Sequence, residues 1–349
     1  MIISFNPAIF QTQDDDMQSI LADILIELLQ DNHFIDPSSI ESIFFDNDNK
    51  YIFNQNKIAQ SHLSDAKRQN LKDYIEKKIH QNITKLYRNH LTHLPIGNNS
   101  EEIHPKDAYK ILTERSKIIV ENGINDWKFI LGICQKYSNS KIKRKSIYQL
   151  LKKAISQEMI EPDHAGGIGD VIKITERWIN ADRYHNIYQY KLMAIFDSDK
   201  EIRNGFKTPH IDKIGYFKRK EIKNIQPSNY EYDANDLIIW HILYKRKIEN
   251  YIPLDILFDK APLITQTQKN DLLSKSESDL DFIDYNKDNN DIGQINIKEE
   301  FPKMFLGNFS YHLLEKRCEH HKVRIELPDG TIEEISELEQ ILLKIVKII

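Results

Sequence analysis

The chain has few of the residues on which several protein classes depend. Only two of its 349 residues are cysteines, Cys134 and Cys318, and they lie far apart in the sequence. Two distant thiols support neither a disulfide framework nor a zinc knuckle, which favours a reducing, cytoplasmic environment. No apolar run approaches the roughly 18 residues of a membrane span, and the first residues lack the basic start of a signal peptide. We therefore expect a cytoplasmic protein with no membrane partner.

Glycine and proline are also sparse, with 11 of each, and the formal net charge is only −5. No glycine-rich stretch leads into the Gly-Lys-Ser/Thr ending of a P-loop, so the chain lacks a nucleotide-binding motif of that kind. Hydrophobic residues make up 40% of the chain, which is enough for a sizeable core. The length allows two domains, or one domain with substantial appendages.

Residues 1–100 are predicted to form a mainly helical N-terminal region. An apolar stripe at helical spacing predicts a helix over 17–29, after three aspartates that suit a helix N-terminus. Aromatic residues on either side of an Asp/Asn-rich turn predict a small hairpin over 41–56. A long helix is expected at 64–92, and the turn-rich segment 93–100 predicts a boundary.

Three further regions follow this boundary. A catalytic domain is expected at 105–260. Residues 261–300 are polar and acidic, which predicts a linker or insertion. Residues 301–349 are predicted to be a helical C-terminal region. Within it, Cys318, His320 and His321 could bind a metal, but no fourth ligand is evident in the sequence.

The segment around Asp197 carries the strongest local signal for function. An apolar run over 192–196 ends abruptly in Asp197-Ser-Asp199, as a buried parallel strand does when it delivers carboxylates to the open end of a sheet. Alternation along an extended chain sends Asp197 and Asp199 to the same side, where they could share a hard cation such as Mg²⁺. The alternative is a strand followed by an ordinary acidic turn.

Other segments predict the neighbours of this strand. A short strand is expected to end at Glu121, and Asp126 can cap or lead the helix that follows. An extended segment at 159–164 leads through a glycine turn into a helix at about 170–181. A further buried strand is predicted over 237–244.

Two runs of basic residues flank these elements. The first lies at 136–154 and the second at 203–224. Such runs are usually solvated faces, and the alternative is a surface that contacts phosphates. The candidate nucleic-acid-binding residues are Lys143, Arg144, Lys145, Lys207, Lys218, Arg219 and Lys220.

Taken together, four segments resemble the TOPRIM nucleases, as in OLD-family and PARIS-type phage-defence effectors. They are Ile118-Ile-Val-Glu121 with Asp126, Gly166-Gly167, Phe196-Asp197-Ser-Asp199 and Arg246-Lys-Ile-Glu249-Asn-Tyr251. The resemblance covers residues 112–258 and departs in its first motif, where Glu-Asn-Gly replaces Glu-Gly and one extra residue separates Glu121 from Asp126. It implies the fold class α/β, with a TOPRIM-like Rossmannoid parallel sheet flanked by N- and C-terminal mainly helical regions.

The resemblance further implies a metal-dependent nuclease that hydrolyses phosphodiester bonds in DNA or RNA, such as tRNA, as the toxic effector of a bacterial anti-phage defence system. The implied cofactor is Mg²⁺ or Mn²⁺. A lysine or arginine from 203–223 or 245–247 would stabilise the transition state. The implied metal ligands are Glu121, Asp126, Asp197, Asp199 and Glu249. The implied catalytic residues are Glu121, Asp197, Asp199 and Lys245.

The other domains of OLD proteins, and the other enzymes with TOPRIM sites, indicate which partners and alternative functions to consider. OLD proteins have an ATPase domain, so a chain without a Walker A motif is expected to act with a separate ATPase or sensor subunit, and self-association is a further expectation. A topoisomerase needs a nucleophilic tyrosine on another large domain, and a primase needs template-handling modules, so hydrolysis is favoured. The alternative is a non-catalytic nucleic-acid-binding or assembly subunit with a vestigial site.

Overall fold

The structure, a computed structural model, describes all residues except 81–82, 167, 203–204, 224–230, 262–263 and 286–299. The chain divides into two compact units, one made of Met1–Arg115 with Lys347–Ile349 and the other of Ser116–Val346. The division falls after Arg115, later than the boundary predicted at 93–100, because that segment contains a strand of the first unit.

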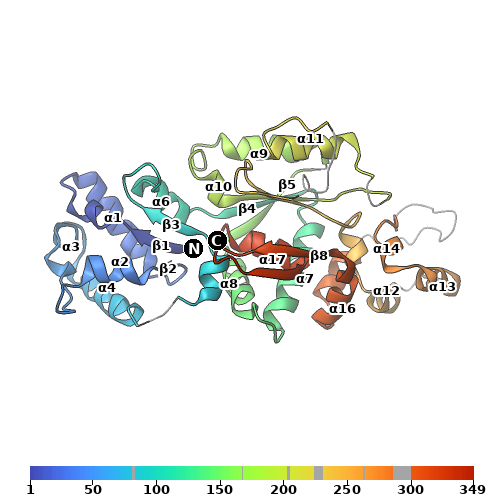
Figure 1. The fold of residues 1–349 in the computed structure, drawn as a ribbon, viewed down its shortest axis with the longest axis horizontal. Helices are drawn as coiled ribbons and strands as arrows, with labels where there is room; N and C mark the ends of the chain where they lie inside the picture. Colours follow the sequence, from blue (N-terminus) through green and yellow to red (C-terminus); the bar gives the residue numbers. More distant parts are fainter. Residues whose placement is uncertain (81–82, 167, 203–204, 224–230, 262–263, 286–299) are drawn as a thin grey trace. The chain divides into compact units, whose positions relative to one another are not determined.

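The first unit contains a small parallel sheet as well as helices (Figure 1). Strand β1 lies between β2 and β3, and all three run parallel. The strands are β1 (Ile2–Phe5), β2 (Phe34–Ile35) and β3 (His93–Ile96). The helices are α1 (Asp15–Leu28), α2 (Pro37–Phe44), α3 (Lys57–His62), α4 (Asp65–Lys78), α5 (Lys85–His90) and α6 (Pro105–Thr113), with 3-10 turns η1 (Pro7–Gln11) and η2 (Phe53–Gln55).

Two predictions for this unit were wrong, and local capping explains the first. The predicted hairpin at 41–56 begins inside α2, since Asp36 caps that helix and Pro37 opens it. Only Phe45 and Tyr51 form an antiparallel bridge. The predicted long helix at 64–92 is divided into α4 and α5, with residues 81–82 outside the described part. The helix predicted at 17–29 is confirmed as α1.

The second unit is built on a four-stranded parallel sheet with the order β5-β4-β6-β7. Its strands are β4 (Ser116–Val120), β5 (Ile160–His164), β6 (Leu192–Phe196) and β7 (Ile239–Ile242). Every residue of β6 and β7 is buried, which explains why these strands are continuous apolar runs without alternation. The strands predicted around Glu121 and before Asp197 are thus confirmed, as is the α/β class with parallel strands.

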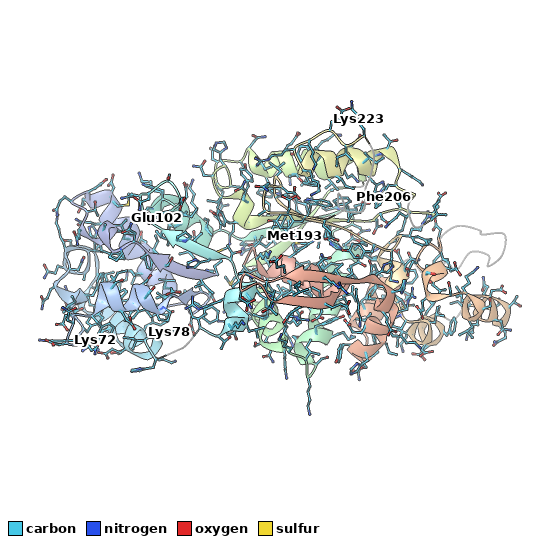
Figure 2. All side chains as sticks on the ribbon, in the orientation of Figure 1. Lys72, Lys78, Glu102, Met193, Phe206 and Lys223 are labelled. Atoms are coloured by element: carbon cyan, nitrogen blue, oxygen red, sulfur yellow. The ribbon has the colours of Figure 1, made fainter. Side chains whose placement is uncertain are left out.

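Helices cover both faces of this sheet. Figure 1 shows α9 (Val171–Ile179) and α11 (Thr208–Phe217) on one face, and α7 (Asn125–Asn139) and α8 (Lys145–Ser156) on the other. Under α11, the rings of Phe196, Phe217 and Trp240 stack with centroids 5.9 to 6.4 Å apart. Figure 2 places Met193 inside the sheet, fully buried, whereas Lys223 is exposed. The short elements between are η3 (Ile168–Asp170) and α10 (Tyr188–Lys191).

The remainder of the second unit combines short helices with an antiparallel hairpin, so the predicted helical C-terminal region also contains strands. The segment predicted as a linker holds α13 (Gln266–Ser274) and α14 (Glu277–Leu280), and its residues 286–299 lie outside the described part. In the described residues, no helix is both long and apolar enough to cross a bilayer. The elements are η5 (Ile248–Tyr251), α12 (Leu254–Lys260), α13 (Gln266–Ser274), α14 (Glu277–Leu280), α15 (Phe301–Leu306), α16 (Tyr311–Arg317), η6 (Glu319–His321), β8 (Lys322–Glu326), β9 (Ile332–Ser336) and α17 (Glu337–Val346).

Candidate active site

The topology of the second unit identifies one edge of its sheet as the place for a site. From β4 the chain crosses to β5 on one side and later to β6 on the other, so the strand order reverses between β4 and β6. Open α/β sheets bind ligands beyond the carboxyl ends of the strands at such a switch point. Val120 pairs with Ile195 across these two strands, and Glu121 and Asp197 follow the strand ends.

Five carboxylates gather at this edge, and we call them the acidic cluster: Glu121, Asp126, Asp197, Asp199 and Glu249. Burial raises the pKa of Asp197 well above its usual range, and the charges of Glu121, Asp126 and Glu249 raise it further. The carboxyl groups that the sequence predicted as metal ligands thus interact electrostatically, although no three of them have ligand oxygens that all lie within 4.8 Å of one another. Like charges in a poorly solvated place repel one another, so joint ionisation needs a positive charge nearby.

Glu121 has a carboxylate oxygen that nothing in the described part of the chain satisfies. Its Oε1 is buried without a hydrogen bond, and the nearest cation, Lys213 Nζ, lies 4.0 Å away. Burial raises the pKa of Glu121 to about 7, against the charge of Lys213 and with the charges of Asp199 and Asp126. A buried, unpaired carboxylate oxygen is costly, so its presence indicates a ligand or a functional role.

Lys213 lies on α11 and reaches the cluster from the helical layer. Its Nζ is 5.0 Å from the centre of the Phe196 ring and has no hydrogen-bond partner among the described residues. Burial lowers the pKa of Lys213 to about 8, although Glu121 and Asp199 oppose the shift. The ammonium group is therefore held beside Glu121 without being fully neutralised by it.

The turn that carries Asp199 is fixed to the segment after β7. The Ser198 hydroxyl donates to the carbonyl oxygen of Lys245 at 2.7 Å, and the Asp199 amide donates to that of Arg246 at 3.0 Å. Asp199 adopts a left-handed conformation with φ 47°, which is unfavourable for a residue other than glycine. Lys247 Nζ lies 3.4 Å from Asp199 Oδ1. Several backbone contacts thus hold Asp199 in a strained turn.

The turn after β4 is held by side-chain hydrogen bonds from both ends. Asn122 Oδ1 accepts from the amides of Ile124 and Asn125, both at 3.0 Å, at the start of α7. Asp126 Oδ2 accepts from the Asn122 amide at 2.8 Å, and burial raises the pKa of Asp126 to about 7 despite this bond. A Cβ added at Gly123 would lie 3.0 Å from the His164 side chain, so the turn has little room for a larger residue.

Glu249 enters the cluster from η5, and its neighbours anchor it. The side-chain amide of Asn250 donates to the carbonyl oxygens of Leu280 and Ile283 at 2.9 and 3.0 Å. Tyr251 is fully buried against Phe129, with ring centroids 5.5 Å apart. The Ile-Glu-Asn-Tyr segment therefore supplies one carboxylate and two anchors.

The structure does not place Lys245 in the acidic cluster, where it was predicted to act. Lys245 is fully buried and forms an ion pair with Asp281. The cations that face the cluster are Lys213 and Lys247. Burial lowers the pKa of Lys247, but Asp199 and Asp197 more than offset this and raise it. Both lysines lie in the segments 203–223 and 245–247, from which a cation beside the site was expected, although neither was singled out within its segment.

Some of the predicted nucleic-acid-binding residues are instead neutralised within the fold. Arg144 is buried and forms a two-pronged pair with Glu339 at 3.1 and 2.9 Å. Lys218 is buried against Asp233 and Asp236 at 3.1 and 3.4 Å. The predictions that Arg144 and Lys218 bind nucleic acid were wrong, because a buried and paired cationic side chain cannot contact a polyanion.

The other predicted nucleic-acid-binding residues keep at least part of their side chains in solvent. Lys143 pairs with Glu333 but is 68% exposed, and Lys207 is exposed beside Glu201. Arg219 and Lys220 are also exposed, and Lys145 is half-buried. Each basic run therefore keeps exposed positive charge among its described residues.

No family model matches the chain, and neither does any curated protein or solved structure. The functional assignment therefore depends on the geometry and chemistry of the acidic cluster itself.

Proposed function

We propose that this protein is a TOPRIM-like, Mg²⁺- or Mn²⁺-dependent nuclease that hydrolyses phosphodiester bonds in nucleic acid at the acidic cluster. The observation that carries the proposal is the buried Glu121 oxygen without a hydrogen bond, at a strand end beside Asp197 and Asp199. Its position at the topological switch point agrees with where open α/β sheets bind ligands.

The residue types in the cluster suit a hard cation. Mg²⁺ prefers carboxylate oxygens, usually takes one or two of them, and keeps several waters. Glu121, Asp197 and Asp199 would hold a first ion, and Asp126 with Glu249 lies within electrostatic reach for a second. When bound, the metal would neutralise charge on the scissile phosphate and lower the pKa of a bound water.

The side chains around the cluster supply the remaining functions. Glu121 would either ligate the ion or act as the general base for an attacking water. Lys213 and Lys247 place positive charge beside the carboxylates, where negative charge develops on the phosphate. His210 adds no charge at neutral pH, because burial and the neighbouring Lys213 lower its pKa to about 4.

The resemblance to phage-defence effectors extends the proposal to a biological role. We infer a toxic effector whose cleavage is held in check until a separate ATPase or sensor subunit responds to infection. The chain carries no Walker A motif of its own, which is the reason to place nucleotide hydrolysis on a partner. Copurification with the products of neighbouring genes would test this, and full activity of the isolated chain would contradict it.

The direct test is cleavage of plasmid DNA and of tRNA in the presence of Mg²⁺ or Mn²⁺. Glu121→Gln should abolish cleavage and leave nucleic-acid binding intact, because it removes a charge without changing size. Glu176→Gln, at an exposed position on α9, is the matched control and should cut as the wild type does. Wild-type protein that binds either substrate but cuts neither in any metal would favour the alternative, a binding or assembly subunit with a vestigial site.

A further inference from the structure

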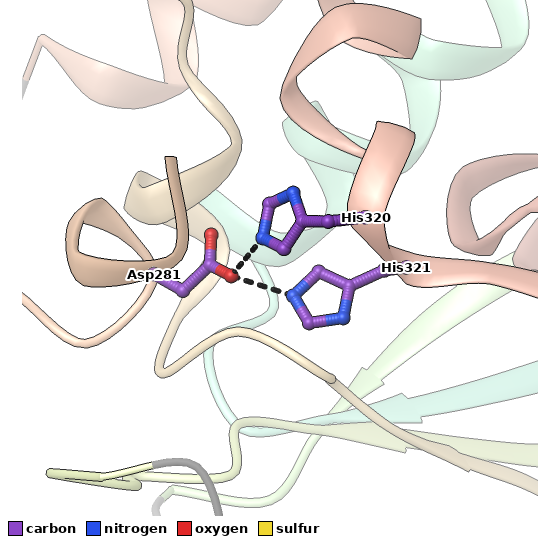
Figure 3. A group of neighbouring side chains, drawn as sticks. All are labelled: Asp281, His320 and His321. Atoms are coloured by element: carbon purple, nitrogen blue, oxygen red, sulfur yellow. Dashed lines mark hydrogen bonds and ion pairs between the residues drawn. The ribbon is translucent and has the colours of Figure 1, made fainter. Parts of the chain in front are cut away.

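A second group of metal-ligand atoms lies outside the acidic cluster. Asp281 follows α14, and His320 and His321 end η6, nearly forty residues later. Figure 3 shows both imidazole rings directed at one carboxylate oxygen: the Nε2 atoms lie 2.5 and 2.6 Å from Asp281 Oδ2. In the described part of the chain, these are the only three His, Cys, Asp or Glu residues whose ligand atoms all lie within 4.8 Å of one another.

The orientation of the Asp281 carboxylate is fixed on the side away from the histidines. Its other oxygen, Oδ1, pairs with Lys245 and lies 3.6 Å from Arg317. The Arg246 amide donates to the Asp281 carbonyl oxygen at 2.8 Å, and Arg317 is itself paired with Glu277. Groups that orient a ligand from its outer side are typical of metal sites, where they set the direction of the ligating atom.

Charge neutralisation alone does not explain why two histidines meet at this oxygen. The Lys245 ammonium already compensates the Asp281 carboxylate, and both residues are almost completely buried. The two rings are only 4.2 Å apart between centroids, so two protonated imidazoles there would repel each other. Two neutral imidazoles and a carboxylate oxygen are instead a ligand set suited to Zn²⁺.

One side of this group is open to solvent. The Asp281 side chain is 1% exposed, whereas those of His321 and His320 are 15% and 29% exposed. An ion could therefore enter from the histidine side and complete its coordination with water. Cys318, which the sequence placed beside these histidines, is fully buried and is not among the three ligand-bearing residues.

We propose that Asp281, His320 and His321 form a second metal site, which binds Zn²⁺ through two imidazole nitrogens and one carboxylate oxygen. The ion would replace the two hydrogen bonds to Asp281 Oδ2, and each imidazole would bind as the neutral form. The site joins η6 to the residue after α14, and through Asp281 to the backbone of Arg246. It would thereby stabilise the segment that leads to Lys247 and Glu249, without depending on what the acidic cluster does.

The test is Zn²⁺ binding by the full chain: the protein is first treated with a chelator, then given Zn²⁺ and dialysed. Elemental analysis should find one Zn²⁺ per chain in the wild type and equally in Glu121→Gln. The double substitution His320→Gln with His321→Gln should lower retention at least tenfold. His312→Gln, an exposed histidine on α16 in the same region, should retain the ion.

A second measurement uses the wild-type protein alone, in case the double variant does not fold. Co²⁺ added to the chelator-treated protein should give visible ligand-field absorption that Zn²⁺ displaces at one equivalent, and Zn²⁺ should raise the Tm. The proposal is overturned if the wild type retains no Zn²⁺ and shows no Co²⁺ absorption. It is also overturned if a folded double variant retains Zn²⁺ as the wild type does.

Discussion

At the scale of single residues, Lys213 is the cation of the second basic run that faces the acidic cluster. It lies 4.0 Å from Glu121 in a buried position, with its ammonium group unbonded within the described residues. A positive charge kept free of hydrogen bonds beside a carboxylate cluster remains available to a phosphate. This distinguishes Lys213 from Lys245, whose charge is used by Asp281.

Replacement of Lys213 tests whether its positive charge contributes to cleavage. We expect Lys213→Met to lower kcat for nucleic-acid cleavage by about 10²-fold, the usual cost of removing one group that stabilises developing charge. Lys173→Met, at an exposed position on α9, should leave kcat unchanged. Equal kcat values for the two variants would remove Lys213 from the mechanism.

The left-handed conformation of Asp199 gives a second prediction at this scale. Glycine adopts this conformation without strain, so Asp199→Gly should abolish cleavage while leaving the free energy of unfolding unchanged or up to about 1 kcal/mol higher. Urea unfolding followed by circular dichroism would measure it. Arg219→Gly is the matched control, since Arg219 has a similar φ of 51° but is exposed and away from the carboxylates. A large loss of stability in Asp199→Gly alone would mean that the Asp199 carboxylate supports the fold.

At the scale of elements, the start of α8 is held to α17 by a buried ion pair. Arg144 donates to both carboxylate oxygens of Glu339, and the Tyr148 hydroxyl donates to Glu339 Oε1 at 2.7 Å. The first basic run is therefore partly a structural contact between two helices. Its charge cannot be counted as surface charge.

Substitutions at neighbouring positions test whether the pair between Arg144 and Glu339 stabilises the fold. Arg144→Ala should lower the free energy of unfolding by about 3 kcal/mol, because Glu339 would be left buried and unpaired. Lys143→Ala should cost less than about 1 kcal/mol, since its pair with Glu333 is largely solvated on the lysine side. Chemical denaturation measures both. If Arg144→Ala were as stable as Lys143→Ala, the pair would contribute nothing to the docking of α17.

The sequence was informative about elements whose signals are local. Buried apolar runs ending in a turn located β4 and β6 within a residue, and with them Glu121 and Asp197. The break between α4 and α5 was missed, because periodicity continues across it. The pairing of Lys245 with Asp281 could not be predicted, since it joins positions 36 residues apart through tertiary packing. Contacts of this kind also decided which basic residues are buried.

At the scale of the whole molecule, the acidic cluster is expected to lower stability in the absence of a cation. Burial and mutual repulsion raise the pKa of Glu121, Asp126 and Asp197 together, so ionising them opposes folding. Mg²⁺ should offset this by binding only the folded protein.

We therefore expect the Tm of the wild type to rise with Mg²⁺ concentration. Asp197→Asn should raise the Tm of the metal-free protein by a few degrees and remove most of the Mg²⁺ dependence. Differential scanning calorimetry with and without chelator provides the measurement. The prediction fails if Asp197→Asn responds to Mg²⁺ as the wild type does.

The first unit is discontinuous in sequence, since Lys347–Ile349 belong to it together with Met1–Arg115. The amino group of Met1 donates to the Ile349 carbonyl oxygen at 3.0 Å, and Ile348 is fully buried. During translation, residues 1–115 are made before the second unit, whereas Lys347–Ile349 are made after it. The interior of the first unit therefore cannot close until the whole second unit has been synthesised.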